Sequence, residues 1–278
     1  MIFFPHCKIN LGLRILRKRA DGYHDLETIF YPLPALRDAL EIIPSDSLSL
    51  HVTGADIPGD PASNLCLKAH ELLARDFPSI QPVEIHLHKH IPTGAGLGGG
   101  SADGAFALRG LNQLFHLGLN REQLLPYAAA LGSDCPFFLY DSPCVASGRG
   151  EILKPLELDL SAYRLALINP GIHVDTGWAF GQLSSPTTPR EEAASLSGGA
   201  PDRGVVPDVI EWKNFLVNDF EVPVFRKYPE IKRIKDHLYE MGAVYAAMSG
   251  SGSTVFGLFP GTQSIQPDFP ASYWTAYL

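Results

Sequence analysis

The sequence predicts an α+β fold in two domains, on three observations. Much of the first hundred residues consists of segments in which apolar and polar residues alternate, as in half-buried strands. A glycine-rich stretch at residues 92–101 joins one such segment to a segment with helical spacing. A continuous apolar run at residues 163–169 opens a second part of the chain. We therefore expect domains at residues 1–156 and 157–278.

The individual elements follow from the same patterns. Strands are expected where alternating or β-branched residues lie between turn residues, and helices where apolar residues recur every three or four positions. The expected strands cover residues 8–16, 26–33, 39–43, 48–52, 83–90 and 163–169. The expected helices cover residues 64–75, 101–115, 121–131 and 229–241. Residues 184–204 are rich in Ser, Pro, Thr, Gly and charge, which predicts a long surface loop.

Composition indicates an ordinary globular protein. The 278 residues are 45% hydrophobic and 19% charged, and the net charge of −8 argues against a general nucleic-acid or membrane surface. No apolar run approaches the roughly 20 residues that cross a bilayer, and the apolar start of the chain is too short for a signal peptide. We therefore expect a cytoplasmic protein whose unpaired cysteines are reduced structural thiols. One basic cluster is either a solvated hairpin end or a local anion site: Arg14, Arg17, Lys18 and Arg19.

The glycine loop, residues 92–101, predicts a phosphate-binding site. Glycines let backbone N–H groups crowd around an anion, and the helix that follows points its positive dipole end at the same place. The loop lacks the lysine of a Walker A motif. It satisfies the dinucleotide fingerprint, but Pro92 after the strand and the helical setting of Glu122 disfavour a dehydrogenase. The residues assigned to nucleotide binding are Pro92, Gly94, Gly96, Leu97, Gly98, Gly99, Gly100 and Ser101.

Three other features leave alternatives open. Three histidines on one face of a strand are expected to form a polar outer face, since no carboxylate or cysteine is spaced to complete a metal site: His86, His88 and His90. Asp134 lies between a small-residue turn and an apolar run, and is either a turn residue or a buried functional acid. A second glycine-rich turn at residues 249–253 is either a hairpin bend or a second backbone surface that converges with the glycine loop on one polyanion.

Taken together, these segments resemble the GHMP kinases, the family of galactokinase, homoserine kinase and mevalonate kinase. The resemblance rests on a lysine-bearing first strand (CKINL, residues 7–11), the glycine loop (PTGAGLGGGS) and the late SGSGS turn. The segments RADGYHDL at residues 19–26 and GSDCPFF at residues 132–138 add to it, so that it spans nearly the whole chain. The family implies an N-terminal domain like the second domain of ribosomal protein S5 and a ferredoxin-like C-terminal domain.

The resemblance also implies a reaction. An ATP- and Mg²⁺-dependent enzyme of this kind would move the γ-phosphoryl group of ATP onto the 2-hydroxyl of a cytidine diphosphate derivative of methylerythritol, in the non-mevalonate isoprenoid precursor pathway. By similarity, Asp134 would take the proton of the attacking hydroxyl, and Lys8 would keep Asp134 ionised. Tyr23 and Phe180 would sandwich the cytosine, and His24 would read its hydrogen-bonding edge. The alternative for the two aromatic rings is packing in the core.

Four further assignments follow from position in the family pattern. Asn10 would contact the substrate diphosphate, and Thr176 would lie beside the nucleotide. Asn64 and Leu65 would line the adenine pocket. Two rivals stay open, a kinase of the same family with another acceptor and an RNA-binding protein suggested by the S5-like fold and the basic cluster. The acidic net charge weighs against the second, so neither a nucleic-acid nor a membrane partner is expected, and no metal ligand is assigned.

Overall fold

A computed structural model describes residues 1–183, 208–265 and 268–278, and the expected loop at residues 184–204 lies outside these ranges. The mixture of helices and sheets confirms the α+β class. The chain forms two compact units, each built from discontinuous segments. In the described ranges, no helix is both long and apolar enough to cross a membrane.

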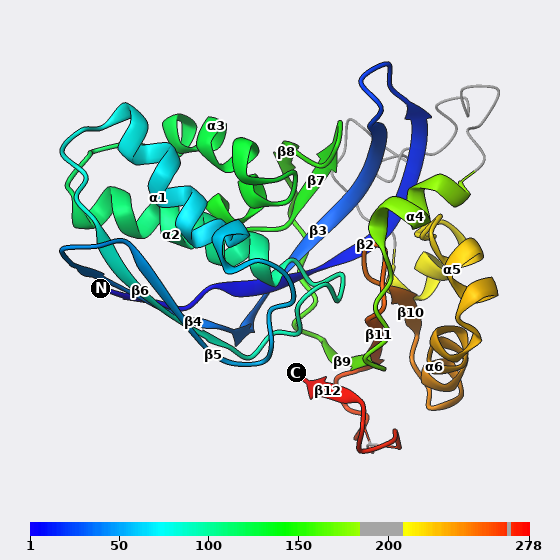
Figure 1. Ribbon diagram of the computed structural model, residues 1–278. Helices are drawn as coiled ribbons and strands as arrows, with labels where there is room; N and C mark the ends of the chain where they lie inside the picture. The colour runs from blue at the N-terminus through cyan, green and yellow to red at the C-terminus, as the bar shows by residue number, and fades with distance from the viewer. Residues whose placement is uncertain (184–207, 266–267) are drawn as a thin grey trace. The chain divides into compact units, whose positions relative to one another are not determined.

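The first unit contains Met1–Lys8, Pro32–Thr93 and Gly98–Asp141. The order of its sheet is β1-β4-β6-β5, with β5 parallel to β6 and the other neighbours antiparallel. Helix α2 packs against α1, α3 and strand β4, so the three helices lie over the sheet (Figure 1). The bounds are β1 (Ile2–Phe3), β4 (Ala39–Pro44), β5 (Ser49–Gly54), η1 (Pro61–Ser63), α1 (Leu65–Asp76), β6 (Val83–Lys89), α2 (Gly99–Leu114), α3 (Arg121–Leu131) and η2 (Cys135–Leu139).

Strand β6 shows why this sheet forms where the sequence predicts it. Its apolar face, Ile85 and Leu87 included, is buried against the helices, whereas His86 and His88 lie on the opposite face. The His86 ring stacks on His51 of β5, and its Nε2 atom lies 3.1 Å from Glu84 Oε1. The expected polar outer face is confirmed. Among the described residues, no group of three or more His, Cys, Asp or Glu could hold a metal ion.

The second unit contains Ile9–Tyr31, Gly94–Leu97 and Ser142–Leu278. Its antiparallel sheet has the order β10-β11-β9-β12, and helix α6 packs on β10 and β11. Three side chains at helical spacing carry that packing and are buried: Ile231, Ile234 and Leu238. The bounds are β9 (Tyr163–Asn169), α4 (Thr176–Gln182), η3 (Val209–Asn214), α5 (Glu221–Lys227), α6 (Pro229–Glu240), β10 (Tyr245–Met248), β11 (Val255–Pro260) and β12 (Trp274–Tyr277).

A third sheet has the order β2-β3-β7-β8. Its strands are β2 (His6–Lys18), β3 (His24–Arg37), β7 (Cys144–Ser147) and β8 (Ile152–Pro155). Strands β2 and β3 each have residues in both compact units. The expected division at residue 156 stays a prediction, because compactness groups discontinuous segments rather than consecutive ones.

Candidate active site

The glycine loop requires glycine at the positions where its backbone turns. Gly94, Gly96 and Gly98 have φ angles of 67°, 79° and 71°, in the left-handed region that other residues rarely adopt. A Cβ atom on Gly96 would lie 2.0 Å from the carbonyl oxygen of Ser249. Two backbone segments therefore approach each other here more closely than any side chain allows.

The late serine-glycine turn contacts the loop within the second unit. Ser249 Oγ donates to the carbonyl of Gly96 at 2.7 Å, and the N–H of Thr254 donates to the carbonyl of Ala95 at 3.2 Å. Asn10 on β2 joins the same group, since its backbone N–H donates to Ser249 Oγ at 3.1 Å. The late turn is the hairpin bend between β10 and β11, and it also lies beside the glycine loop. That the two turns bind one polyanion stays a prediction.

The N-terminus of α2 has no side-chain cap among the described residues. The first N–H groups of an α-helix have no partner within the helix, and most helices cover some of them with a side chain. Asn64 caps α1 by accepting from the N–H of Cys66 at 2.9 Å, and Asn120 caps α3. The N-cap residue of α2 is Gly98, and no described side chain makes a capping hydrogen bond there. This end of α2 is suited to an anion.

Lys8 and Asp134 form an ion pair in the first unit. Lys8 Nζ lies 3.3 Å from Asp134 Oδ2, and the exposed fractions of the two side chains are 3% and 34%. A Cβ atom on Gly98 would lie 3.0 Å from Lys8 Cε, so the lysine stem packs under the end of the glycine loop. Asp134 directly precedes η2, whose Phe137 and Phe138 are buried. The arrangement fixes a buried cation beside a carboxylate that solutes can reach.

The residues expected at the cytosine lie in the second unit. The His24 ring stacks on Phe180 with centroids 4.9 Å apart and planes inclined by 16°. The Tyr23 side chain is largely exposed, and the Arg149 guanidinium lies over its ring at 4.7 Å. Partial burial, together with the charge of Lys18, lowers the pKa of His24, which favours the neutral imidazole at pH 7. The sandwich of Tyr23 and Phe180 around a base stays a prediction.

Each of the remaining predicted residues makes contacts within its own unit. Thr176 begins α4, and its hydroxyl shares a 2.8 Å hydrogen bond with that of Ser251 in the late turn. Asn10 Nδ2 donates to Thr28 Oγ1 at 3.0 Å. Asn64 lies on the wall of a cavity of about 340 Å³ formed by β5, η1 and the segment between them. Leu65 packs against α2, where a Cβ atom on Gly104 would come within 2.7 Å of Leu65 Cβ.

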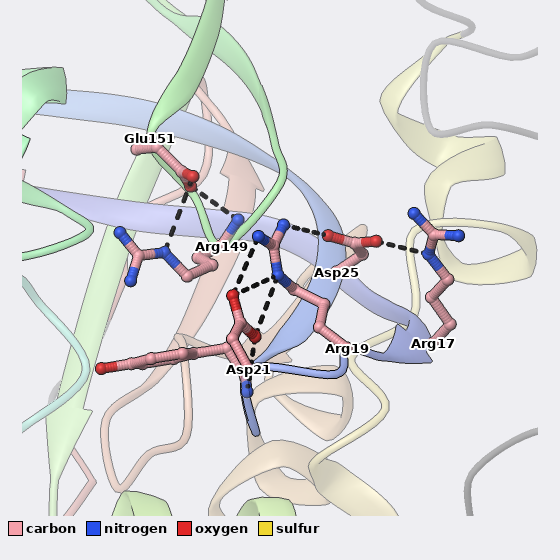
Figure 2. A network of polar contacts seen from close by, with 7 residues as sticks. Arg17, Arg19, Asp21, Asp25, Arg149 and Glu151 are labelled. Atoms are coloured by element: carbon pink, nitrogen blue, oxygen red, sulfur yellow. Dashed lines mark hydrogen bonds and ion pairs between the residues drawn. The ribbon is translucent and has the colours of Figure 1, made fainter.

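Two arginines of the basic cluster are paired with acidic residues. Arg17 Nε donates to Asp25 at 2.5 Å, and Arg19 donates both to Asp25 and to Asp21 (Figure 2). The hydrogen bonds from Arg17 and Arg19 lower the pKa of Asp25, so this carboxylate stays charged and offsets them. Arg14 donates to the carbonyl of Phe215 at 2.9 Å. These contacts favour a solvated hairpin end over an anion site.

Two features of the site were missed by the sequence analysis. Arg149 pairs with Glu151 at 3.6 Å (Figure 2). Its guanidinium lies over the Tyr23 ring, although Arg149 and Tyr23 are far apart in sequence. A buried cluster of Lys89, Asp38 and Asp103 lies at the base of the glycine loop. The signal for Lys89 was present, because it falls on the apolar face of an alternating strand.

Comparison with known proteins gives consistent matches along the chain. A family model described as the GHMP kinases N terminal domain matches residues 64–142, and one described as GHMP kinases C terminal matches residues 207–267. A 4-diphosphocytidyl-2-C-methyl-D-erythritol kinase from Bacteroides fragilis is 50% identical over 98% of this chain and 97% of its own length. The protein of the same name from Bacteroides thetaiotaomicron is also 50% identical, over 93% of this chain and 92% of its own.

Solved structures agree with these relatives. A crystal structure of 4-(cytidine 5'-diphospho)-2C-methyl-D-erythritol kinase has a TM-score of 0.72 and 35% identity, over 93% of this chain and 90% of that chain. The Streptococcus pneumoniae phosphomevalonate kinase has a TM-score of 0.67 with 14% identity, over 94% of this chain and 92% of that chain, and supports the fold alone. The two-domain fold expected from the motifs is confirmed.

Proposed function

This chain belongs to the GHMP kinase family, and from that premise we propose how its residues phosphorylate the 2-hydroxyl of 4-diphosphocytidyl-2-C-methyl-D-erythritol with ATP. The acceptor is that of relatives half identical to this chain over nearly its whole length. The reaction belongs to the non-mevalonate route to isoprenoid precursors. The observation that carries the assignment of roles is the Lys8–Asp134 pair at the end of the glycine loop.

Asp134 is the proposed general base. Its carboxylate takes the proton of the acceptor hydroxyl as the oxygen forms its bond to the γ-phosphorus, and the bond from that phosphorus to the β-phosphate oxygen breaks to release ADP. Lys8, 3.3 Å away, holds the carboxylate in place and offsets the negative charge that develops on the attacking oxygen. This step asks the protein mainly for positioning, which a buried lysine and a carboxylate at the start of η2 provide.

The glycine loop is the proposed phosphate site. The uncapped N–H groups at the start of α2 and the turns at Gly94, Gly96 and Gly98 would donate to the phosphate oxygens of ATP. A magnesium ion would add positive charge there. Such an ion commonly keeps several water ligands and is bound through substrate phosphates, so it does not need a cluster of protein ligands. The described residues contain no group of three or more His, Cys, Asp or Glu that could hold a metal ion.

The two bases of the substrates are proposed to bind apart. The 340 Å³ cavity beside Asn64 suits the adenine of ATP, with Leu65 next to it. Thr176 would lie beside the nucleotide part of the cytidyl substrate. Tyr23 and Phe180 would stack on the cytosine, and the neutral His24 could both donate to and accept from the edge of the base. Asn10 would contact the diphosphate. Stacking tolerates any base, so the choice of cytosine would rest on His24.

Loss of the Tyr23 ring is expected to weaken binding of the cytidyl substrate selectively. Tyr23→Leu should raise the KM of that substrate about 5- to 100-fold, since base stacking on an aromatic ring is worth about 1–3 kcal/mol. The KM of ATP and the Tm should stay unchanged, because the Tyr23 side chain is 54% exposed. Tyr23→Phe keeps the ring and should stay within about twofold of the parent chain. Equal substrate KM values in Tyr23→Leu and the parent would move the cytosine site elsewhere.

Product analysis tests the position of transfer. With the cytidyl substrate and MgATP, phosphorus NMR of the product should show one new phosphomonoester, coupled to the carbon that bears the 2-hydroxyl. A phosphorylated product at another hydroxyl would contradict the proposed geometry of base and acceptor.

A cytoplasmic location is proposed as well. The four cysteines are buried and none of them forms a disulfide, as expected of thiols kept reduced inside the cell.

A further inference from the structure

A buried cluster of three charged side chains lies at the base of the glycine loop. Lys89 Nζ, at the end of β6, donates to Asp38 and, at 2.7 Å, to Asp103 Oδ2 on α2. The side chains of all three are at most 3% exposed. The proposed phosphoryl transfer makes no use of these three side chains. Burying charged groups costs desolvation free energy, so a buried cluster that the reaction does not use calls for an explanation.

The cluster joins the two segments that flank the loop. Asp38 Oδ1 accepts from the N–H groups of His90 and Ile91, at 2.6 and 2.9 Å, directly before the loop begins. Asp103 lies in the second turn of α2, directly after the loop ends. A Cβ atom on Gly99 would lie 3.3 Å from Lys89 Nζ, so the ammonium is close to the first turn of that helix. A change of charge in the cluster therefore changes the electrostatic potential at the place where the loop would bind phosphates.

The cluster holds more negative than positive charge. One ammonium faces two carboxylates, and the second oxygen of Asp103, Oδ1, is buried with no hydrogen-bond partner among the described residues. A carboxylic acid in that position would be neutral and would remove the excess charge. Burial raises the pKa of Asp103 to about 7, against the opposing effect of Lys89 and with the added effect of Asp38.

The other titratable groups around the cluster do not supply the missing positive charge. Cys66 on α1 and Cys7 on β2 interact electrostatically with these carboxylates, and burial raises the pKa of both thiols, so they are neutral at pH 7. Burial disfavours the charge of Lys89, but Asp103 and Asp38 outweigh this and raise its pKa, so the ammonium stays charged. Lys8 also faces Cys7, but it is paired with Asp134. Of the groups with a shifted pKa in and around the cluster, the carboxyl of Asp103 is the one whose pKa lies near neutrality.

We propose that binding of nucleotide phosphates at the glycine loop is coupled to uptake of one proton from solvent by the buried Asp103 of the Lys89–Asp38–Asp103 cluster. The inference rests on the proposed role of the loop. A polyanion above the first turn of α2 repels the excess negative charge below it, and protonation of Asp103 removes that charge. Because linkage is reciprocal, protonated protein binds the nucleotide more tightly. Affinity is then highest below about pH 7 and falls as the pH rises and Asp103 ionises.

Calorimetry of ADP binding tests the coupling directly. The full chain is titrated with ADP at pH 7 in buffers of different ionisation enthalpy, and the slope of the observed enthalpy against that quantity counts the protons taken up. The parent chain is compared with Asp103→Asn, which keeps the shape of the side chain but cannot ionise. Protons exchanged by ADP itself cancel in the difference. The parent should take up more protons, by up to about half a proton, since a group with a pKa near 7 is about half protonated at that pH.

A matched control keeps the chemical change and removes the burial. Asp141→Asn alters an aspartate in the same unit whose side chain is 84% exposed, and its proton uptake should equal that of the parent. Equal proton uptake by the parent and Asp103→Asn, with ADP bound to both, would overturn the coupling. Failure of the parent to bind ADP, or equal binding after the Gly96→Ala change discussed below, would instead overturn the role of the loop.

A second measurement needs no variant, in case Asp103→Asn does not fold. In the parent chain labelled with ¹³C at aspartate carboxyls, one resonance should titrate near pH 7, and ADP should raise its midpoint. If every aspartate carboxyl titrates below about pH 5, as ordinary aspartates do, the coupling is wrong.

Discussion

Asp134→Asn is expected to lower kcat by about 10²- to 10⁴-fold while the protein still binds MgATP and the cytidyl substrate, the range over which a positioned general base acts. Asparagine keeps the size of the side chain but cannot take the proton of the hydroxyl. Lys8, whose ammonium lies 3.3 Å from Asp134 in the parent, would also lose its charged partner. Because Lys8 is only 2% exposed, a modest fall in Tm should accompany the loss of activity.

The control for this prediction is Asp141→Asn, an exposed aspartate in the same unit, which should retain the kcat of the parent. Single-turnover kinetics with preformed ternary complex isolate the transfer step from substrate binding. A kcat for Asp134→Asn within a few fold of the parent, with chemistry still rate-limiting, would remove Asp134 from the role of base and leave it as a turn residue before η2.

Gly96→Ala is expected to disable the glycine loop. The φ angle of 79° alone costs a non-glycine residue about 1–2 kcal/mol, and the new Cβ atom would lie 2.0 Å from the Ser249 carbonyl oxygen. Such a contact is relieved only if the loop or the late turn moves, which also breaks the hydrogen bond from Ser249 Oγ to the Gly96 carbonyl. We expect a lower Tm and a KM for ATP raised at least about tenfold, measured by thermal unfolding and initial rates.

Gly100→Ala is the matched control for protein stability. Among the described residues, no atom outside its chain neighbours and the backbone of its own helix lies within 4 Å of the Cβ position of Gly100. This residue is in the first turn of α2 rather than at a left-handed position. Its Tm should equal or slightly exceed that of the parent, since alanine restricts the unfolded chain more than glycine does. An unchanged Tm and ATP KM in Gly96→Ala would mean that the loop tolerates displacement and does not depend on its close approach to Ser249.

Elements with a strong local signal could be predicted from the sequence. Alternation placed a strand at residues 83–90, where β6 covers Val83–Lys89. The helix expected at residues 121–131 is α3, because Asn120 and Gln123 form a capping box that fixes where it begins. Helix α2 begins at Gly99 rather than at the expected residue 101, since its first two residues are glycines that by themselves favour no helix.

Elements defined by their partners could not be predicted. Strands β1, β7, β8 and β12 are two to four residues long, too short for a period to be recognised. They form through pairing: β1, β7 and β12 each pair with a longer strand, and β8 pairs with β7. Strands β2 and β3 extend beyond the predicted ranges for the same reason, since pairing continues into charged residues that the apolar pattern had excluded.

The residues of the candidate site also divide into those with a local sequence signal and those brought together only by the fold. The loop and the late turn were recognisable as sequence, whereas the roles of Lys8 and Asp134 came from the resemblance, because no spacing rule joins residues so far apart. The contact of Arg149 with Tyr23 is tertiary and has no local signal. Lys89 had one, since a lysine that shares the face of Ile85 and Leu87 must be buried and therefore paired.

The most direct test of the central claim is the choice of acceptor. ADP release from MgATP would be measured with 4-diphosphocytidyl-2-C-methyl-D-erythritol and, in parallel, with galactose, homoserine and mevalonate, for the parent chain and Asp134→Asn. We expect turnover with the cytidyl substrate alone, and the loss of that turnover in Asp134→Asn. Turnover by folded parent protein with one of the other acceptors, and none with the cytidyl substrate, would keep the kinase family but contradict the cytosine site assigned to Tyr23, His24 and Phe180.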